Sequence, residues 1–112
     1  MAVTTNSSPF GSSARTGVLL GLHLLSESYA RELARLLGIT LSSVQKALKS
    51  LERDGLVAGR AAGRTRLYRL NPSAFARPDL ERYLTRLLEP EVELRARAST
   101  LRRRPRQSGK PL

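Results

Sequence analysis

The fold is decided by the stretch RELARLLGITLSSVQKALKSLERDGLV (residues 31–57). Its two amphipathic segments repeat leucine or valine at the three- and four-residue spacing of one helix face. Gly38 is suited to the left-handed conformation that ends a helix, and the hydroxyl of Thr40 is suited to capping the next one. The stretch therefore predicts a helix over residues 30–37, a short turn, and a second helix over residues 41–54.

One more helix is expected before this pair. Residues 1–12 are rich in serine, threonine and asparagine, and predict a flexible arm followed by a helix that Ser12 or Ser13 caps. Gly17 and Gly21 lie four residues apart, so they share a face of this helix and permit close packing. The apolar residues that predict its core-facing side are Val18, Leu19, Leu22 and Leu25.

After the helical pair, the sequence changes to a strand pattern. The segment LVAGRAAGRTRLYRL predicts two short strands joined by a turn that Gly59 and Gly63 allow to form. A leucine and tyrosine stripe over residues 78–88 predicts another helix, with a proline suited to its first turn. Residues 89–112 predict a charged extension, which begins as an exposed helix and is largely disordered after position 104.

Length and composition limit the class of protein. The 112 residues fit one small domain, placed at residues 13–88, with 40% hydrophobic residues and no tryptophan. No cysteine is present, which excludes disulfides, thiolate metal sites and thiol catalysis. The apolar run at residues 17–25 is far shorter than the roughly 20 residues that cross a bilayer. Because the N-terminus also lacks a secretory pattern, we expect a cytoplasmic protein with no membrane partner.

The charge of the chain favours a polyanionic partner. The net charge is +11 and the pI is near 11.5, which indicates nucleic acid first. Residues 56–77 carry five arginines and no acidic residue. Residues 95–112 carry seven basic residues and no acidic one. This last block either adds non-specific affinity for phosphate, which we favour, or only keeps the chain soluble.

The order of helix, helix-turn-helix pair, hairpin and further helix resembles the winged helix-turn-helix transcriptional regulators, above all the ArsR-like and MarR-like groups. The resemblance rests on RELARLLGITLSSVQKALKSLERDGLV and GRAAGRTRLYRLNP, and covers about residues 13–72. It implies an α+β, mostly helical fold, with a three-helix core, a two- or three-stranded β wing and a C-terminal helix. It also implies a sequence-specific regulator of double-stranded DNA, a nucleoid-associated repressor. We expect a homodimer formed through the first helix and the helix at residues 78–88.

The candidate DNA-binding residues lie mainly on the second helix of the pair and on the hairpin. A B-DNA major groove admits one α-helix, so short or polar side chains near its start let the backbone approach the bases. We expect helix 41–54 in the major groove and wing 59–66 on the minor groove or its phosphates. Gln45 suits an adenine edge and Lys46 a guanine or a phosphate, while arginine suits a narrow minor groove. The predicted contacts are Arg31, Thr40, Ser42, Ser43, Gln45, Lys46, Lys49, Arg60, Arg64 and Arg66.

The sequence contains no recognisable catalytic or metal-binding constellation. His23 is the single histidine and lies on an apolar helix, so we expect it to be packed rather than to bind a metal. No enzymatic activity, metal or cofactor is therefore predicted. Two alternatives to a sequence-specific regulator stay open. One is a winged-helix module that docks on protein, antitoxin-like or subunit-docking, and the other is a non-specific DNA-binding protein driven by the basic tail.

Overall fold

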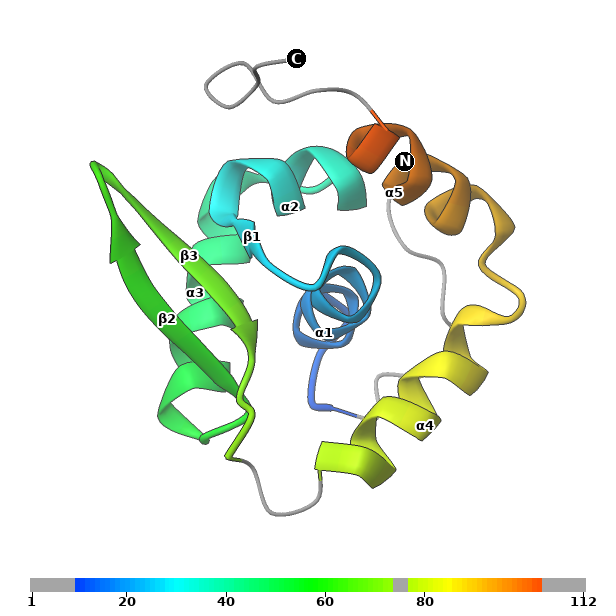
Figure 1. The fold of residues 1–112 in the computed structure, drawn as a ribbon, viewed down its shortest axis with the longest axis horizontal. Coiled ribbons are helices and arrows are strands. Elements are labelled where there is room, and N and C mark those ends of the chain that lie inside the picture. Colours follow the sequence, from blue (N-terminus) through cyan, green and yellow to red (C-terminus); the bar gives the residue numbers. More distant parts are fainter. Residues whose placement is uncertain (1–9, 74–76, 104–112) are drawn as a thin grey trace.

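One helix lies at the centre of the fold, and the other elements surround it (Figure 1). The computed structural model describes residues 10–73 and 77–103. The central helix, α1, contacts α2, α3, α4, α5 and β3, and the fold is α+β and mostly helical, as predicted. In chain order the elements are α1 (Ser13–Leu25), β1 (Ser28–Tyr29), α2 (Ala30–Leu37), α3 (Leu41–Arg53), β2 (Val57–Ala62), β3 (Thr65–Leu70), α4 (Arg77–Leu88) and α5 (Val92–Arg103).

Helix α1 is buried along most of its length because it fills this centre. Ser12 caps it by accepting a hydrogen bond of 3.1 Å from the backbone N–H of Arg15. An added Cβ at Gly21 would lie 2.8 Å from a methyl group of Leu33 in α2, so the predicted close packing is confirmed. Residues 16–22 are all buried. The expectation that the first helix supplies a dimer surface is therefore wrong for this stretch, since one chain already covers it.

Helices α2 and α3 form the predicted helix-turn-helix. Helix α2 ends at Gly38, whose φ of 70° lies in the left-handed region. Thr40 then caps α3 by accepting a hydrogen bond of 3.1 Å from the backbone N–H of Ser43. Helix α3 ends at Arg53, one residue before the predicted end, and the chain turns at Gly55 with a φ of 82°. The inner face of α3 buries Val44, Ala47, Leu48 and Leu51.

The wing is a three-stranded antiparallel sheet. Strands β2 and β3 form the hairpin, and the short β1 pairs with the other side of β3, so the order is β1-β3-β2. The turn consists of Gly63, with a φ of 65°, and Arg64. The expectation that Gly59 also forms the turn is wrong, because this residue lies within β2 opposite Tyr68. The two-residue turn makes both strands six residues long.

Helices α4 and α5 cover α1 on the side away from the hairpin (Figure 1). The sequence predicts an exposed helix at the start of the charged extension. Instead, α5 buries Leu94 and Ala98, which are 6% and 3% exposed. The packed region therefore extends past residue 88 into α5, where Leu101 also packs against the core. Most of the predicted flexible arm and the predicted disordered end of the chain lie outside the described residues.

Three arginines of α5 hydrogen-bond to carbonyl groups at the C-terminal ends of other helices. Such carbonyls have no partner within their own helix, and a cation is favourable at that end of the helix dipole. The pairs are Arg95 with Leu88 of α4 at 3.0 Å, Arg97 with Leu36 of α2 at 2.8 Å, and Arg102 with Leu25 of α1 at 3.2 Å. These three arginines of the basic block therefore also have a structural role, because they hold α5 against the ends of three helices.

Arg102 also completes a buried polar cluster. Glu32, in the first turn of α2, is 8% exposed. Its carboxylate accepts hydrogen bonds from Arg102 at 3.0 Å and from the Ser28 hydroxyl at 2.7 Å. A buried carboxylate is tolerated only when such donors replace water. The cluster fastens the end of α5 to the start of α2.

Candidate nucleic-acid interface

The outer face of α3 is polar, and its one acidic side chain, Glu52, three residues after Lys49, is paired with Arg66 of the hairpin. The residues of this face recur every three or four positions, so they lie on one side of the helix, opposite the buried face. We call this set the α3 stripe, and all of its members are exposed: Ser42, Gln45, Lys46, Lys49 and Arg53. The sequence prediction omits Arg53, although its place four residues after Lys49 puts it on the same face.

The N-terminal end of α3 exposes part of its hydroxyl groups. The Thr40 hydroxyl accepts a hydrogen bond from the backbone N–H of Ser43 and donates one of 2.8 Å to the Ser43 hydroxyl. Ser43 is half-buried, whereas Thr40 and Ser42 are exposed. Of the three predicted hydroxyl contacts, Thr40 and Ser42 thus face outward, while Ser43 is used mainly by the cap.

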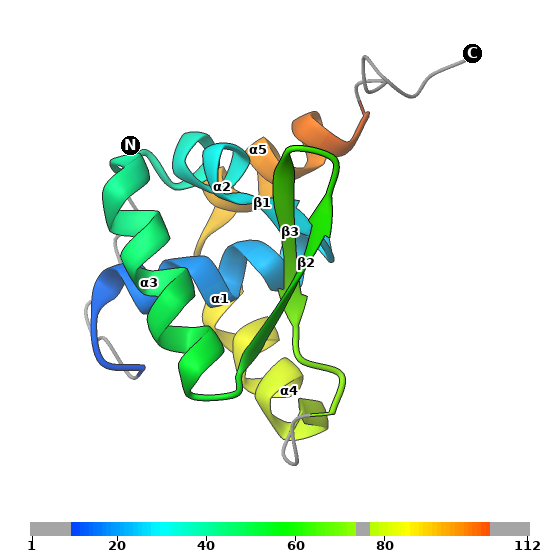
Figure 2. The ribbon, with the colours of Figure 1, turned by 90° about the vertical axis from the view of Figure 1, so that its left-hand side faces the viewer.

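Helix α3 and the hairpin lie side by side (Figure 2). The turn of the hairpin and the N-terminal end of α3 are at the same end of the molecule in this view. Arg64 is at the turn and is exposed. Within the described part of the chain it forms no hydrogen bond or ion pair. The structure therefore leaves one predicted wing arginine available at the tip.

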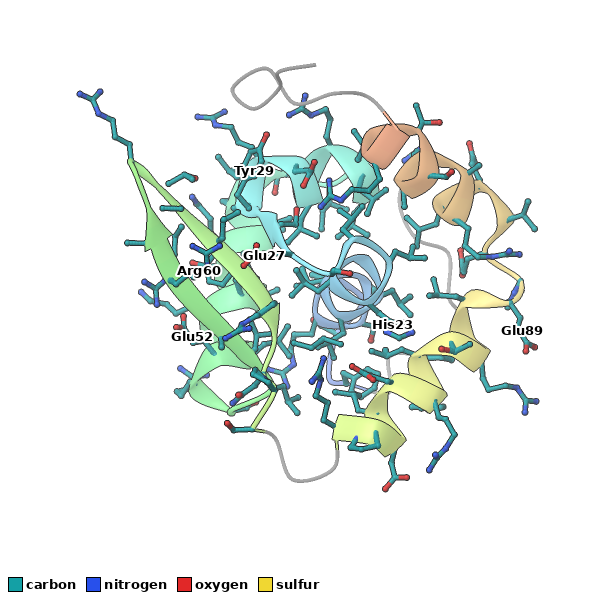
Figure 3. All side chains as sticks on the ribbon, viewed as in Figure 1. His23, Glu27, Tyr29, Glu52, Arg60 and Glu89 are labelled. Carbon is teal, nitrogen blue, oxygen red and sulfur yellow. The ribbon has the colours of Figure 1, made fainter. Side chains whose placement is uncertain are left out.

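Arg60 does not reach the tip of the hairpin. The strand register pairs it with Leu67, midway along the two strands. Its guanidinium donates hydrogen bonds of 3.1 and 3.2 Å to the carboxylate of Glu27, and Figure 3 shows the two side chains. The prediction that Arg60 lies at or beside the tip is therefore wrong, and the side chain is engaged in an ion pair.

Arg66 is also paired within the chain. Its guanidinium donates a hydrogen bond of 2.8 Å to the carboxylate of Glu52 in the last turns of α3. This hydrogen bond, and next the negative charge of Glu52, raise the pKa of Arg66 above its ordinary value. The segment from β2 to β3 contains no acidic residue of its own, but the fold brings two glutamates to its arginines. The sequence prediction misses both glutamates.

Arg31 lies on α2 and is therefore not part of the α3 stripe. It is exposed and shares a helix face with Arg35, four residues further on. Arg35 lines a groove between α2 and α5, together with Leu36 and Ala96. Thr40 caps the helix that carries the α3 stripe, and the hairpin turn that carries Arg64 lies at the same end of the molecule (Figure 2).

The far end of α3 is anchored to α1. Arg15 donates hydrogen bonds to the Ser50 hydroxyl and to the carboxylate of Asp54, the second at 2.9 Å. Its side chain is 20% exposed, so this contact is partly shielded from water. Together with the buried inner face of α3, Arg15 gives the stripe a rigid support on the core.

His23 lies away from this surface and links two helices. Its Nε2 is 2.8 Å from the hydroxyl of Thr85, which joins α1 to α4. Among residues 10–73 and 77–103, no group of three or more His, Cys, Asp or Glu side chains is placed to hold a metal ion. No helix in the same part of the chain has the length and apolar character needed to cross a membrane.

This chain is similar to known transcriptional regulators. The family described as "Sugar-specific transcriptional regulator TrmB" matches residues 16–73, just over half of the 112-residue chain. The match runs from α1 past the end of the hairpin. The HTH-type transcriptional regulator Rv2034 of Mycobacterium tuberculosis is 42% identical over 65 residues, which are 56% of this chain. The matched region covers 61% of that regulator, so this chain spans less than two thirds of its length.

Solved structures show the same fold. Reduced HlyU from Vibrio cholerae is 27% identical with a TM-score of 0.55, over 69% of this chain and 75% of that protein. A point mutant of ZitR from Lactococcus lactis is 25% identical with a TM-score of 0.59, over 83% of this chain and 66% of that protein. The predicted resemblance to winged helix-turn-helix regulators is confirmed. By its family match, the chain belongs to the TrmB family of transcriptional regulators.

Proposed function

We propose that this chain binds double-stranded DNA in a sequence-specific manner, with α3 in the major groove and the hairpin on the adjacent minor groove or its phosphates. The observation that carries the proposal is the α3 stripe: five exposed polar or cationic side chains on a helix held by a buried apolar face. The acidic neighbour of the stripe, Glu52, is neutralised by its ion pair with Arg66. An outward face with three cations suits phosphate, because each cation placed on a phosphate releases a condensed counterion.

The roles follow from the chemistry of the side chains. Gln45 suits bidentate hydrogen bonding to an adenine edge, and Lys46 suits guanine or a phosphate. Thr40 and Ser42, at the N-terminal end of α3, suit a phosphate oxygen, because the helix dipole and free backbone N–H groups also favour an anion there. Arg64 suits the minor groove, whose negative potential is greatest where it is narrow.

The other positions that the sequence suggests, together with Arg53, have lesser roles in this proposal. Lys49 and Arg53 extend the stripe and contact phosphates, which adds affinity without sequence information. Arg31, exposed at the start of α2, is a further phosphate contact in this proposal. Arg60 and Ser43 support the surface through Glu27 and the helix cap.

We also propose that two copies of the chain act together on a palindromic site. Along α4, Tyr83 is 45% exposed although its ring lies 5.8 Å from that of Phe10, and Leu80 and Leu87, which pack against the core, are only half-buried. This is more apolar surface than a solvated helix face needs, and it is available for a second copy. Sedimentation equilibrium should give twice the monomer mass, and Tyr83→Glu should return the protein to a monomer. A monomer in both cases would refute the homodimer.

A bound dimer over a promoter would exclude the transcription machinery, so we propose that the protein is a repressor. We also propose that it is located with the nucleoid in the cytoplasm and has no catalytic activity.

Genomic footprinting tests sequence-specific binding by identifying the bound sites. We expect sites with two related half-sites, about 34 Å or a multiple apart along the DNA. Footprints without a shared sequence would refute sequence-specific binding. Capture of a stoichiometric protein partner, with weak DNA binding only, would favour a protein-docking module instead.

A further inference from the structure

Arg66 joins the hairpin to α3, and three contacts hold its side chain. It leaves β3 on the face that turns towards α3, opposite Ala61 of β2. Besides the 2.8 Å hydrogen bond to Glu52, its guanidinium donates a hydrogen bond of 3.3 Å to the carbonyl of Gly59. The guanidinium carbon lies 5.8 Å from the centre of the Tyr68 ring, within the range of a cation–π contact.

The strand residue beneath this side chain is a glycine, and any larger residue would displace Arg66 from this position. A Cβ built on Gly59 would lie 2.7 Å from Nε of Arg66, 3.0 Å from its Nη2 and 3.0 Å from the ring of Tyr68. Gly59 does not have a positive φ, so the backbone conformation does not require glycine there. The missing side chain instead leaves the space through which Arg66 reaches Glu52.

We propose that Arg66 is a positioning residue for DNA binding, which fixes the hairpin against α3 through Glu52, and that it does not itself contact DNA. The inference rests on the proposed function. The hairpin and α3 enter neighbouring grooves, so both bind well only if the angle between them is set before the DNA arrives. Arg66 spans these two elements, and its Nη2 donates to both Glu52 and the carbonyl of Gly59. Arg64, two residues earlier, is exposed at the turn and has no such partner among the described residues.

The salt dependence of binding separates the two roles. A cation that contacts a phosphate contributes about 0.9 to the slope of log K against log salt concentration. Arg64→Ala should therefore weaken binding and lower the slope by roughly this amount. Arg66→Ala should weaken binding about two- to fivefold, the range expected for an exposed ion pair, with an unchanged slope. A slope that falls equally in both variants would overturn the positioning role.

Two further variants test the contact without changing the net charge. The double variant Glu52→Arg with Arg66→Glu rebuilds the ion pair in reverse and has the net charge of the wild-type chain, so binding should recover to the level of the wild-type chain. If Arg66 contacts phosphate, the reversed pair leaves a carboxylate facing DNA and no recovery occurs. Gly59→Ala keeps every charge but displaces the Arg66 side chain, so it should lower affinity about as much as Arg66→Ala, with an unchanged slope.

The experiment uses fluorescence anisotropy with the full chain, the site found by footprinting and a scrambled duplex of the same length. Circular dichroism melting of each variant shows whether it folds, and the reversed pair decides the question if Gly59→Ala does not fold. If the wild-type chain binds both duplexes equally, the proposed function fails. If it prefers the site, but the reversed pair does not recover binding, only the positioning role of Arg66 fails.

Discussion

Replacing Arg102 by methionine removes the contacts of its guanidinium while keeping most of the side-chain volume. In the native chain, Arg102 donates to the buried carboxylate of Glu32 and to the last carbonyl of α1. Hydrogen bonds to charged groups contribute roughly 1.5–3 kcal/mol, and removing one partner of a buried ion pair costs about 3–5 kcal/mol. Arg102 is 27% exposed and the hydroxyl of Ser28 still donates to Glu32, so the effect lies at the lower end. We expect Arg102→Met to lower the free energy of unfolding by about 2–3 kcal/mol.

Urea unfolding followed by circular dichroism measures this loss, and a melting curve should shift downward by about 8–20 °C for a domain of this size. Arg86→Met is the matched control. Its ion pair with Glu89 spans 3.7 Å between side chains that are 78% and 64% exposed, so its loss should be below about 0.5 kcal/mol. The double variant Glu32→Gln with Arg102→Met should recover part of the stability, because no uncompensated charge is then buried. An effect of Arg102→Met no larger than that of the control would refute the structural role of α5.

Three further substitutions test the local geometry of α1 and of the helix-turn-helix, each measured by urea unfolding. Gly21→Ala gains about 1 kcal/mol of helix propensity. The new methyl group also presses on the buried Leu33, and this overpacking costs about 1–3 kcal/mol, so we expect a net loss of stability. A net gain would contradict the close packing. Thr40→Ala should cost about 1 kcal/mol through loss of the α3 cap, while Thr40→Ser should be near neutral. Gly38→Ala should cost about 1 kcal/mol because of the left-handed φ of 70°, and no loss would mean that α2 ends differently.

Features decided by neighbouring residues can be predicted from the sequence. Gly38 and Thr40 end one helix and begin the next through contacts within four residues, and the sequence predicts both in place. The stripe on α3 follows from helical periodicity alone, and the buried and exposed faces fall where the pattern predicts them. The turn of the hairpin is less certain from sequence because Gly59 and Gly63 both suit it. The strand register that decides between them depends on pairing with β3.

Contacts between distant residues cannot be predicted in the same way. Arg60 and Glu27 are 33 residues apart, and Arg102 and Glu32 are 70 apart. Nothing in the local sequence distinguishes an arginine that will meet a glutamate from one that will stay in solvent. For the same reason, the basic end of the chain resembles a free extension in sequence, although three of its arginines stabilise helix ends. Helix α5 packs only Leu94, Ala98 and Leu101 against the core. Three apolar residues among many charged ones are too few to predict from the sequence that this helix is packed.

The most direct test of the central claim is the preference of the chain for its own site over a scrambled duplex, measured by fluorescence anisotropy at a fixed salt concentration. The double substitution Gln45→Ala with Lys46→Ala removes two exposed side chains of the α3 stripe, and Arg86→Ala on α4 is the control for loss of charge. Each base contact is worth about 1–3 kcal/mol of discrimination, so the double variant should lose roughly 5-fold or more of its preference, while the control keeps it. An unchanged preference in the double variant would contradict the assignment of α3 as the helix that reads DNA.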